Sequence, residues 1–290
     1  MVIVQRVVLG AAVVPERNGM GFPLEAGGPF FLDAVPVQVI QDRIAFVLGD
    51  VVDADREGRV HIEKLAAAFR VGRHHGMDRV GRAFAKLLGA KVYLPDYRLA
   101  PEHPFPLSID DTLQAYRWLL DQGNDPKSIV FSGDSAGGPL VVSVVVKARH
   151  AGLPLPAGGA ALSPWANLEH TGASIDNRDG LDPQASRIGL TLLAKAFLNG
   201  ALPNDPDASP VFADVRGLPP ILVQIGENEV MLSDAMRLAT HLGENRVRVS
   251  LEVWPGMFHV WHLFAAILPE GMRAVENAAL FLEQAMRVKD

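Results

Sequence analysis

The feature that most constrains this chain is a serine flanked by glycines, placed between an apolar strand and an apolar helix. A run of β-branched and aromatic residues, Ile129–Phe131, leads into Gly-Asp-Ser-Ala-Gly-Gly, and Pro139–Val146 follows with the composition of a buried helix. The central Ser135 must take a strained backbone conformation, and its neighbours need almost no side chain for the turn to close. The order of strand, turn and helix predicts a nucleophile elbow that presents the Ser135 hydroxyl.

An anion that forms at such a turn meets free N–H groups at the amino end of the following helix. We therefore expect the N–H of Ala136, the residue after the serine, to be an oxyanion donor. A plain strand-to-helix turn also satisfies the pattern, so the interpretation depends on finding the other groups that a serine nucleophile needs.

Composition narrows the function classes. The chain has 290 residues, of which 49% are hydrophobic, and it carries a net charge of −6, which favours neither a nucleic-acid nor an anionic membrane partner. It contains no cysteine, which excludes disulfides, thiolate zinc sites and thiol catalysis. The apolar run Val7–Val14 is too short to span a bilayer and lacks a signal cleavage site, so we interpret it as a strand of a cytoplasmic protein.

Strands and helices alternate from about residue 80 onward. Besides the elbow, strands are expected at Lys91–Leu94, Gly159–Leu162, Ile221–Ile225 and Val249–Trp254. Helices are expected at Ser108–Asp121, Ser186–Leu198 and Gly271–Val288. Continuous apolar strands separated by helices predict an α/β fold with a mostly parallel sheet covered on both faces.

Two regions break this alternation within what we interpret as a single domain of residues 1–290. Residues 168–210 combine loops rich in Asp, Pro and Asn with one helix, and an insertion of this length between strands predicts a lid over the pocket. A peripheral surface excursion is the alternative. Residues 1–60 show no clear period, and apart from the strand at Val7–Val14 no element is assigned to them.

A serine nucleophile needs a base, and in this fold the chain order is serine, acid, histidine. His259 lies just beyond the last strand and before the closing helix, which is the expected position. His103 precedes the serine and so has the wrong order. The histidines expected at helix ends or on the surface, without a role, are His150, His170, His241 and His262.

The acid that orients the histidine is expected after the strand Ile221–Ile225, where the loop offers Glu227, Glu229 and Asp234. Glu229 lies a few residues past the strand end, where a side chain can turn toward the pocket. Asp234 is expected to cap or to open the next helix, and Glu227 is expected in solvent. We favour Glu229 and keep Asp234 as the alternative.

These segments together resemble the hormone-sensitive-lipase-like branch of the α/β-hydrolases, also called bacterial family IV carboxylesterases. The matching segments span roughly residues 72–288 in the family's order: Asp96-Tyr-Arg-Leu-Ala-Pro-Glu-His-Pro-Phe-Pro106, Gly133-Asp-Ser-Ala-Gly-Gly138, Leu162-Ser-Pro-Trp165, and the loops of Glu229 and His259. The combination is highly specific.

The resemblance implies a Ser135–His259–Glu229 triad, with glutamate where the family usually has aspartate. It also implies a cap, here residues 168–210, a small-molecule ester as substrate, and no cofactor or metal. The Asp96–Pro106 segment is expected to be structural, with Arg98 paired to a carboxylate such as Asp96 or Glu102. A homodimer is kept as a hypothesis.

The chain departs from the family at the His-Gly-Gly-Gly string that supplies most of the oxyanion hole. No such string occurs, and the position about thirty residues before Asp96 holds Leu65-Ala-Ala-Ala-Phe69. Ala66 and Ala67 could still donate N–H groups, but each methyl restricts the backbone. The stretch Ile62–Arg70 also favours a helix over an extended loop.

One hypothesis for this departure is a disturbed reading frame upstream, because GGC glycine codons read one base over become GCG, alanine. The next position argues against it, since a histidine codon shifted the same way gives threonine or methionine rather than Leu65.

The function predicted from the sequence is a serine carboxylesterase for short-to-medium acyl esters, with activity reduced by the missing oxyanion string. Trp254, Phe258 and Trp261 either line its substrate pocket or fill the core. The alternatives are a lactone hydrolase, which uses the same machinery, and a non-catalytic binding protein such as the plant hormone receptors of similar fold. Those receptors lose the histidine that this chain keeps.

Overall fold

Six strands of the described part of the chain form one sheet. The computed structural model describes residues 2–5 and 77–287. The strands lie in the order β2-β1-β3-β4-β5-β6. Their bounds are β1 (Val2–Gln5), β2 (Lys91–Tyr93), β3 (Ile129–Asp134), β4 (Gly158–Leu162), β5 (Ile221–Gly226) and β6 (Val249–Trp254). The strands β3 to β6 pair in parallel, whereas β1 runs antiparallel to both of its neighbours.

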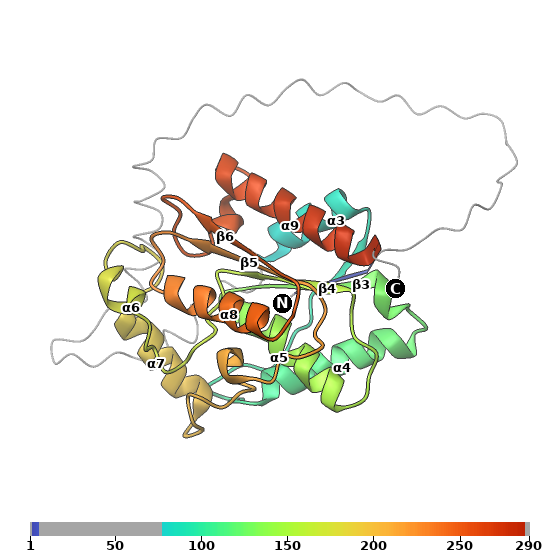
Figure 1. Ribbon diagram of the computed structural model, residues 1–290, viewed down its shortest axis with the longest axis horizontal. Coiled ribbons are helices and arrows are strands. Elements are labelled where there is room, and N and C mark those ends of the chain that lie inside the picture. The colour runs from blue at the N-terminus through green and yellow to red at the C-terminus, as the bar shows by residue number, and fades with distance from the viewer. Residues whose placement is uncertain (1, 6–76, 288–290) are drawn as a thin grey trace, which may run out of the picture.

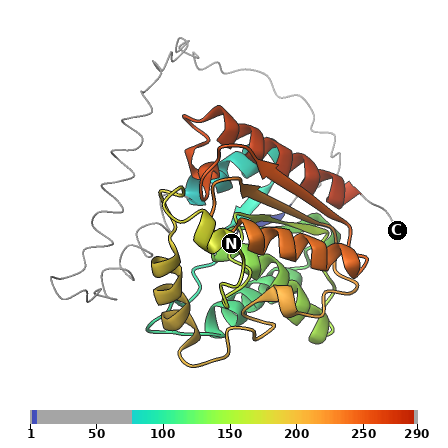
Figure 2. The same ribbon diagram turned by 60° about the vertical axis from the view of Figure 1, so that its left-hand side comes forward.

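Helices cover both faces of the sheet, as Figures 1 and 2 show. One face carries α3 (Met77–Leu88) and α9 (Pro269–Arg287), and the other carries α4 (Leu107–Asp121), α5 (Gly137–His150) and α8 (Leu232–Glu244). Two hydrophobic clusters fill the corresponding interfaces, and α5 contributes an almost continuous buried run to the larger one. The sheet predicted from the sequence is therefore confirmed as an α/β fold with two covered faces.

The central strands are buried because helices pack on both of their faces. Every residue of β4 and β5 is buried, and so is β3 up to Gly133. This burial explains why their sequences are apolar throughout instead of alternating between apolar and polar residues. The carboxyl ends of these parallel strands lie along one edge, where the loops that follow them meet.

An excursion of the chain between β4 and β5 holds α6 (Ser174–Asn177), α7 (Arg187–Leu198) and a 3₁₀ turn at Pro210–Phe212. Figure 1 shows α6 and α7 together at the left of the molecule. The helix α7 begins where the Ser186 hydroxyl accepts a hydrogen bond from the Gly189 N–H at 3.2 Å, and it ends at Asn199 in the left-handed conformation.

Several predictions concern residues outside the described ranges. These are the strand at Val7–Val14, the three alanines after Leu65, and residues 1–60 apart from Val2–Gln5, which form β1. Among the described residues, no helix is both long enough and apolar enough to cross a membrane.

Candidate active site

The backbone at Ser135 forms a tight turn between β3 and α5. Ser135 has a φ of 52°, in the left-handed region, and its N–H donates to the Leu162 carbonyl at 3.0 Å. A Cβ added at Gly138 would lie 2.6 Å from the Pro164 Cα, so that position admits no side chain. These contacts fix the serine at the carboxyl end of its strand, with Ala136 at the amino end of α5.

A chain of hydrogen bonds joins the serine, the histidine after β6 and a glutamate after β5. His259 Nε2 lies 2.8 Å from Ser135 Oγ, and His259 Nδ1 lies 2.8 Å from Glu229 Oε2. His259 is buried and Glu229 is completely buried. This geometry can draw the serine proton to Nε2 while Nδ1–H donates to the carboxylate.

The Glu229 carboxylate is held by further donors. Its Oε1 accepts the Ser163 hydroxyl at 2.7 Å and the Gly226 N–H at 2.6 Å. The same Ser163 hydroxyl accepts the Val260 N–H at 3.1 Å. Ser163 therefore ties the glutamate to the loop that carries His259.

Electrostatics at His259 favour its protonated form. Burial disfavours the imidazolium, but the hydrogen bond and the charge of Glu229, together with the charges of Asp182 and Asp134, outweigh burial and raise the pKa of His259. The arrangement thus stabilises an imidazolium at His259 through Glu229.

The two alternative acids lie elsewhere. Asp234 is in the first turn of α8 and is buried, and burial raises its pKa to about 7 against the opposing effects of Arg237 and Asn167. Glu227 is exposed and accepts the Gly256 N–H at 2.9 Å. Neither makes the contact to His259 that Glu229 makes.

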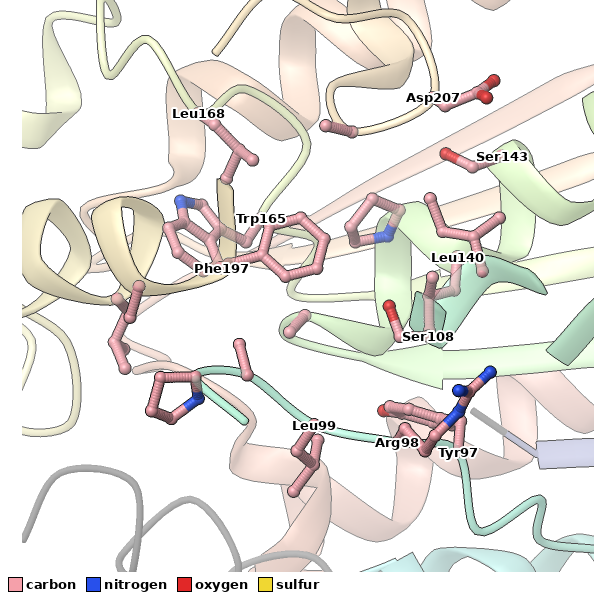
Figure 3. A pocket seen from close by; sticks show the side chains of 18 of the residues that line it. Tyr97, Arg98, Leu99, Ser108, Leu140, Ser143, Trp165, Leu168, Phe197 and Asp207 are labelled. Atoms are coloured by element: carbon pink, nitrogen blue, oxygen red, sulfur yellow. The ribbon is translucent and has the colours of Figure 1, made fainter. Parts of the chain in front are cut away.

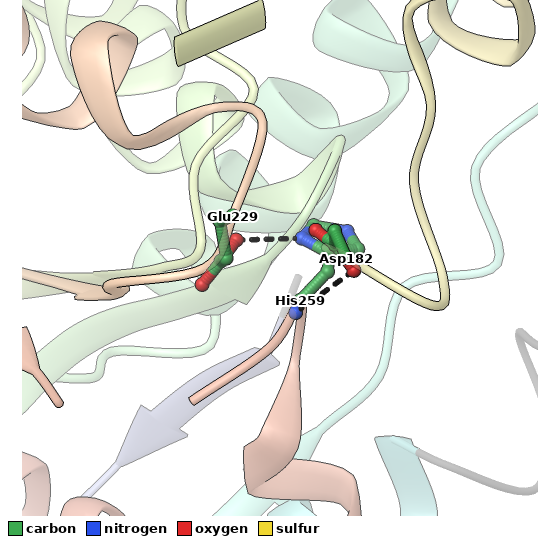
Figure 4. Close-up of side chains that lie close together, drawn as sticks. All are labelled: Asp182, Glu229 and His259. Atoms are coloured by element: carbon green, nitrogen blue, oxygen red, sulfur yellow. Dashed lines mark hydrogen bonds and ion pairs between the residues drawn. The ribbon is translucent and has the colours of Figure 1, made fainter. Parts of the chain in front are cut away.

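Asp182 was not anticipated from the sequence, although it lies beside this site. Asp182 belongs to the excursion and is buried. One of its carboxylate oxygens accepts the backbone N–H of His259 at 3.4 Å. Polar atoms of Asp182, Glu229 and His259 all lie within 4.8 Å of one another (Figure 4). Both ring nitrogens of His259 already have hydrogen-bond partners, so the cluster suits proton transfer rather than metal binding.

An apolar pocket opens next to Ala136 (Figure 3). Its walls come from the segment 97–101, the starts of α4 and α5, the segment after β4, and α7. The side chains that form them include Tyr97, Leu99, Ile109, Leu140, Trp165, Leu168, Leu193 and Phe197. The excursion therefore forms one wall of the pocket, through α7.

None of the three aromatic residues predicted near the substrate lines this pocket. Trp261 is fully buried and packs against His262, with ring centroids 3.9 Å apart. Trp254 donates its indole N–H to Glu252 at 3.0 Å, and Phe258 packs edge-on against Phe264.

Two histidines expected at helix ends or on the surface are instead buried. His170 stacks on Trp165 and accepts the indole N–H at 2.9 Å, and burial lowers its pKa to about 4. His262 is hydrogen-bonded to Gln224 at 3.0 Å, and burial lowers its pKa to about 3. Each ring packs against a tryptophan, which sequence position alone did not reveal.

Arg98 pairs with Asp111, a carboxylate other than the two named from the sequence. Its guanidinium binds both oxygens of Asp111, at 2.7 and 2.9 Å, and its backbone N–H binds the same carboxylate. Asp111 lies on α4, so the pair links the segment after β2 to that helix. Asp96 and Glu102, the partners expected from the sequence, are closer to Arg98 along the chain than Asp111, which is 13 residues away.

Several known proteins are similar to this chain. The family described as "alpha/beta hydrolase fold" matches residues 66–263. An acetyl-hydrolase of Streptomyces hygroscopicus is 39% identical, over 80% of this chain and 78% of its own. An esterase of Acinetobacter venetianus is 32% identical, over 84% of this chain and 82% of its own.

Solved structures add a likeness in three dimensions. An esterase from the bacterial hormone-sensitive lipase family is 46% identical with a TM-score of 0.69, covering 70% of this chain and 69% of that one. EstE5, in a crystal soaked with p-nitrophenyl butyrate, is 43% identical with a TM-score of 0.69, covering 72% of this chain and 70% of that one.

Proposed function

The chain belongs to the α/β-hydrolase family, in its hormone-sensitive-lipase-like branch, and is a carboxylic ester hydrolase; from this premise we propose that Ser135 is its nucleophile, His259 its base and Glu229 its acid. The observation that carries this proposal is the pair of 2.8 Å contacts that His259 makes, one from each ring nitrogen. No other acid of the loop after β5 reaches His259 in this way.

The reaction proceeds in two displacements. Ser135 Oγ bonds to the ester carbonyl carbon while its proton passes to His259 Nε2 and an electron pair moves onto the carbonyl oxygen. Collapse of this intermediate breaks the bond to the alcohol, which leaves with the proton from His259. Water then attacks the acyl-enzyme with His259 as base, which releases the carboxylic acid and restores the Ser135 hydroxyl.

The oxyanion is stabilised by the N–H of Ala136. Ala66 and Ala67, the further donors expected from the sequence, lie outside the described residues. Loss of one oxyanion donor costs about 10²–10³ in turnover. We expect p-nitrophenyl butyrate to be turned over about a hundredfold more slowly than by a family member with His-Gly-Gly-Gly assayed in parallel. Equal turnover would contradict impairment.

The apolar pocket beside Ala136 takes the acyl chain of a short-to-medium ester. Its position next to the nucleophile and its aliphatic and aromatic walls support this assignment. Because α7 forms one wall, the 168–210 segment acts as the cap of the site. The cytoplasmic location and the homodimer expected from the sequence remain predictions.

A serine-directed phosphonate tests the nucleophile directly. We expect the full-length protein to be labelled on Ser135, and Ser135→Ala to lose both the label and the hydrolysis of p-nitrophenyl butyrate. Folded protein that takes up no label would refute the mechanism and favour a binding protein.

A further inference from the structure

Asp182 is a buried carboxylate beside the proposed triad that the mechanism above does not use. The residue is 6% exposed, and its Oδ1 accepts the backbone N–H groups of Gln184, at 3.0 Å, and of His259, at 3.4 Å. Its Oδ2 is buried and has no hydrogen-bond partner among the described residues. A buried carboxylate oxygen without a partner costs free energy, so the position calls for an explanation.

The excursion contacts both main-chain polar groups of His259. Asp182 accepts its N–H, and the Gln184 side chain donates to its carbonyl oxygen at 2.9 Å. Two residues of one loop thus hold the peptide groups on either side of the His259 Cα. The orientation of the imidazole therefore depends on the excursion as well as on Glu229.

The charge of Asp182 acts on the same ring. When Ser135 gives up its proton, His259 becomes a buried cation. The Asp182 carboxylate attracts this cation, because polar atoms of Asp182 and His259 lie within 4.8 Å of each other. The attraction is present only while His259 is protonated, so it favours the transition state over the resting state.

We propose that Asp182 is a second acid of this site: a positioning residue, supplied by the excursion, that fixes the His259 loop and stabilises the His259 imidazolium. This inference rests on the proposed function, in which His259 carries the proton.

The proposal predicts a pH dependence with a definite sign. The acidic groups that face His259 are Glu229 from the loop after β5, Asp134 from the end of β3, and Asp182 from the excursion. The nearby His262 stays neutral because burial lowers its pKa to about 3. Each carboxylate raises the pKa of His259, so removing one lowers the pH at which His259 becomes the free base.

The test uses Asp182→Asn, which keeps an oxygen acceptor for both N–H groups and removes the charge. We expect the acid limb of kcat/KM for p-nitrophenyl butyrate to move to lower pH by roughly one unit, and kcat on the plateau to fall about tenfold. An acid limb that stays at the wild-type pH in folded Asp182→Asn would overturn the proposal.

Two control variants separate charge from position. Gln184→Leu removes the contact to the His259 carbonyl and keeps the Asp182 charge, so we expect a lower kcat with an unchanged acid limb. Glu227→Gln removes an exposed carboxylate of the loop after β5, and we expect both kcat and the limb to match the wild type. An acid limb that moves as far in Glu227→Gln as in Asp182→Asn would mean a general charge effect and would refute a specific role of Asp182.

Phosphonate labelling distinguishes failure of this inference from failure of the proposed function. Wild-type protein that is labelled on Ser135, with an unmoved limb in Asp182→Asn, overturns only the role of Asp182. Wild-type protein that takes up no label overturns the nucleophile itself.

Discussion

At the scale of single residues, one hydroxyl group organises two members of the proposed triad. Ser163 donates to Glu229 and accepts from the main chain next to His259, and it holds a φ of 46° to do so. A non-glycine residue in this region costs of order 1–3 kcal/mol and persists where the surroundings require it. Here the requirement is the simultaneous contact with two loops.

We therefore expect Ser163→Ala to lower kcat/KM about tenfold to a hundredfold, because the Glu229 carboxylate and the Val260 N–H both lose a partner. Unfolding in urea should show a loss of about 1–3 kcal/mol. Ser132→Ala is the matched control, since the Ser132 hydroxyl is buried without a hydrogen-bond partner among the described residues. If both variants lose the same activity, the role assigned to Ser163 is wrong.

The residues of the site differ in how readily the sequence reveals them. Ser135, His259 and Glu229 could be chosen because each follows a predicted strand of a parallel sheet, and such strands place their carboxyl ends together. Asp182 could not be chosen, because it lies in an irregular loop and meets His259 across 77 residues of chain. Arg98 has several carboxylates nearby in sequence, and only the direction of α4 selects Asp111.

At the scale of elements, α7 matters through the two different faces it presents. Leu193 lines the apolar pocket, whereas Ile188 is 67% exposed on the outer side of the same helix. The sequence predicted a helix over Ser186–Leu198, and the helix runs from Arg187 to Leu198. The sequence could not indicate which surface the apolar face of this helix would cover, because that depends on packing between distant segments.

Leu193→Trp should shorten the acyl chains that the protein accepts, because the larger side chain occupies the pocket. We expect kcat/KM for p-nitrophenyl hexanoate to fall at least about tenfold relative to that for the acetate. Ile188→Trp, the same change on the solvent face of α7, should leave this ratio at its wild-type value. A ratio unmoved by Leu193→Trp would place the acyl chain elsewhere.

The strands were predictable for a related reason. The strands β3 and β5 consist mostly of buried apolar residues, whereas β6 mixes apolar residues with Ser250 and Glu252; the predicted bounds of all three differ from the observed ones by at most three residues. In contrast, β1 is four residues long and pairs with segments far away in the chain, so no local pattern distinguishes it. Its antiparallel direction departs from the parallel order of the strands beside it.

At the scale of the whole molecule, buried ionisable groups link stability to pH. The folded protein keeps His170 and His262 neutral, with pKa values of about 4 and about 3, whereas an unfolded chain protonates histidine near 6.5. Their contribution to stability is therefore complete above about pH 6.5 and is lost as the pH falls toward 4 and 3. Asp234, with its pKa raised to about 7, has the opposite sign, because its contribution is lost as the pH rises from about 4 to 7.

His170→Gln isolates one of these contributions, because glutamine can still accept the Trp165 indole N–H and does not titrate. The expected result is a smaller drop in Tm between pH 7 and pH 4.5 than in the wild-type protein, measured by thermal unfolding at each pH. A drop as large as that of the wild type would show that His170 does not take up a proton on unfolding.

The contact between Ser135 and His259 joins positions 124 residues apart, and the shorter link from His259 to Glu229 still encloses 30. Contacts of such long sequence separation form slowly during folding, because the loop between them must close first. Helices such as α5 can form from local contacts alone. A refolding chain will therefore regain the circular dichroism of its helices before it regains catalysis. The return of ester hydrolysis then reports when the last long-range contact of the site forms.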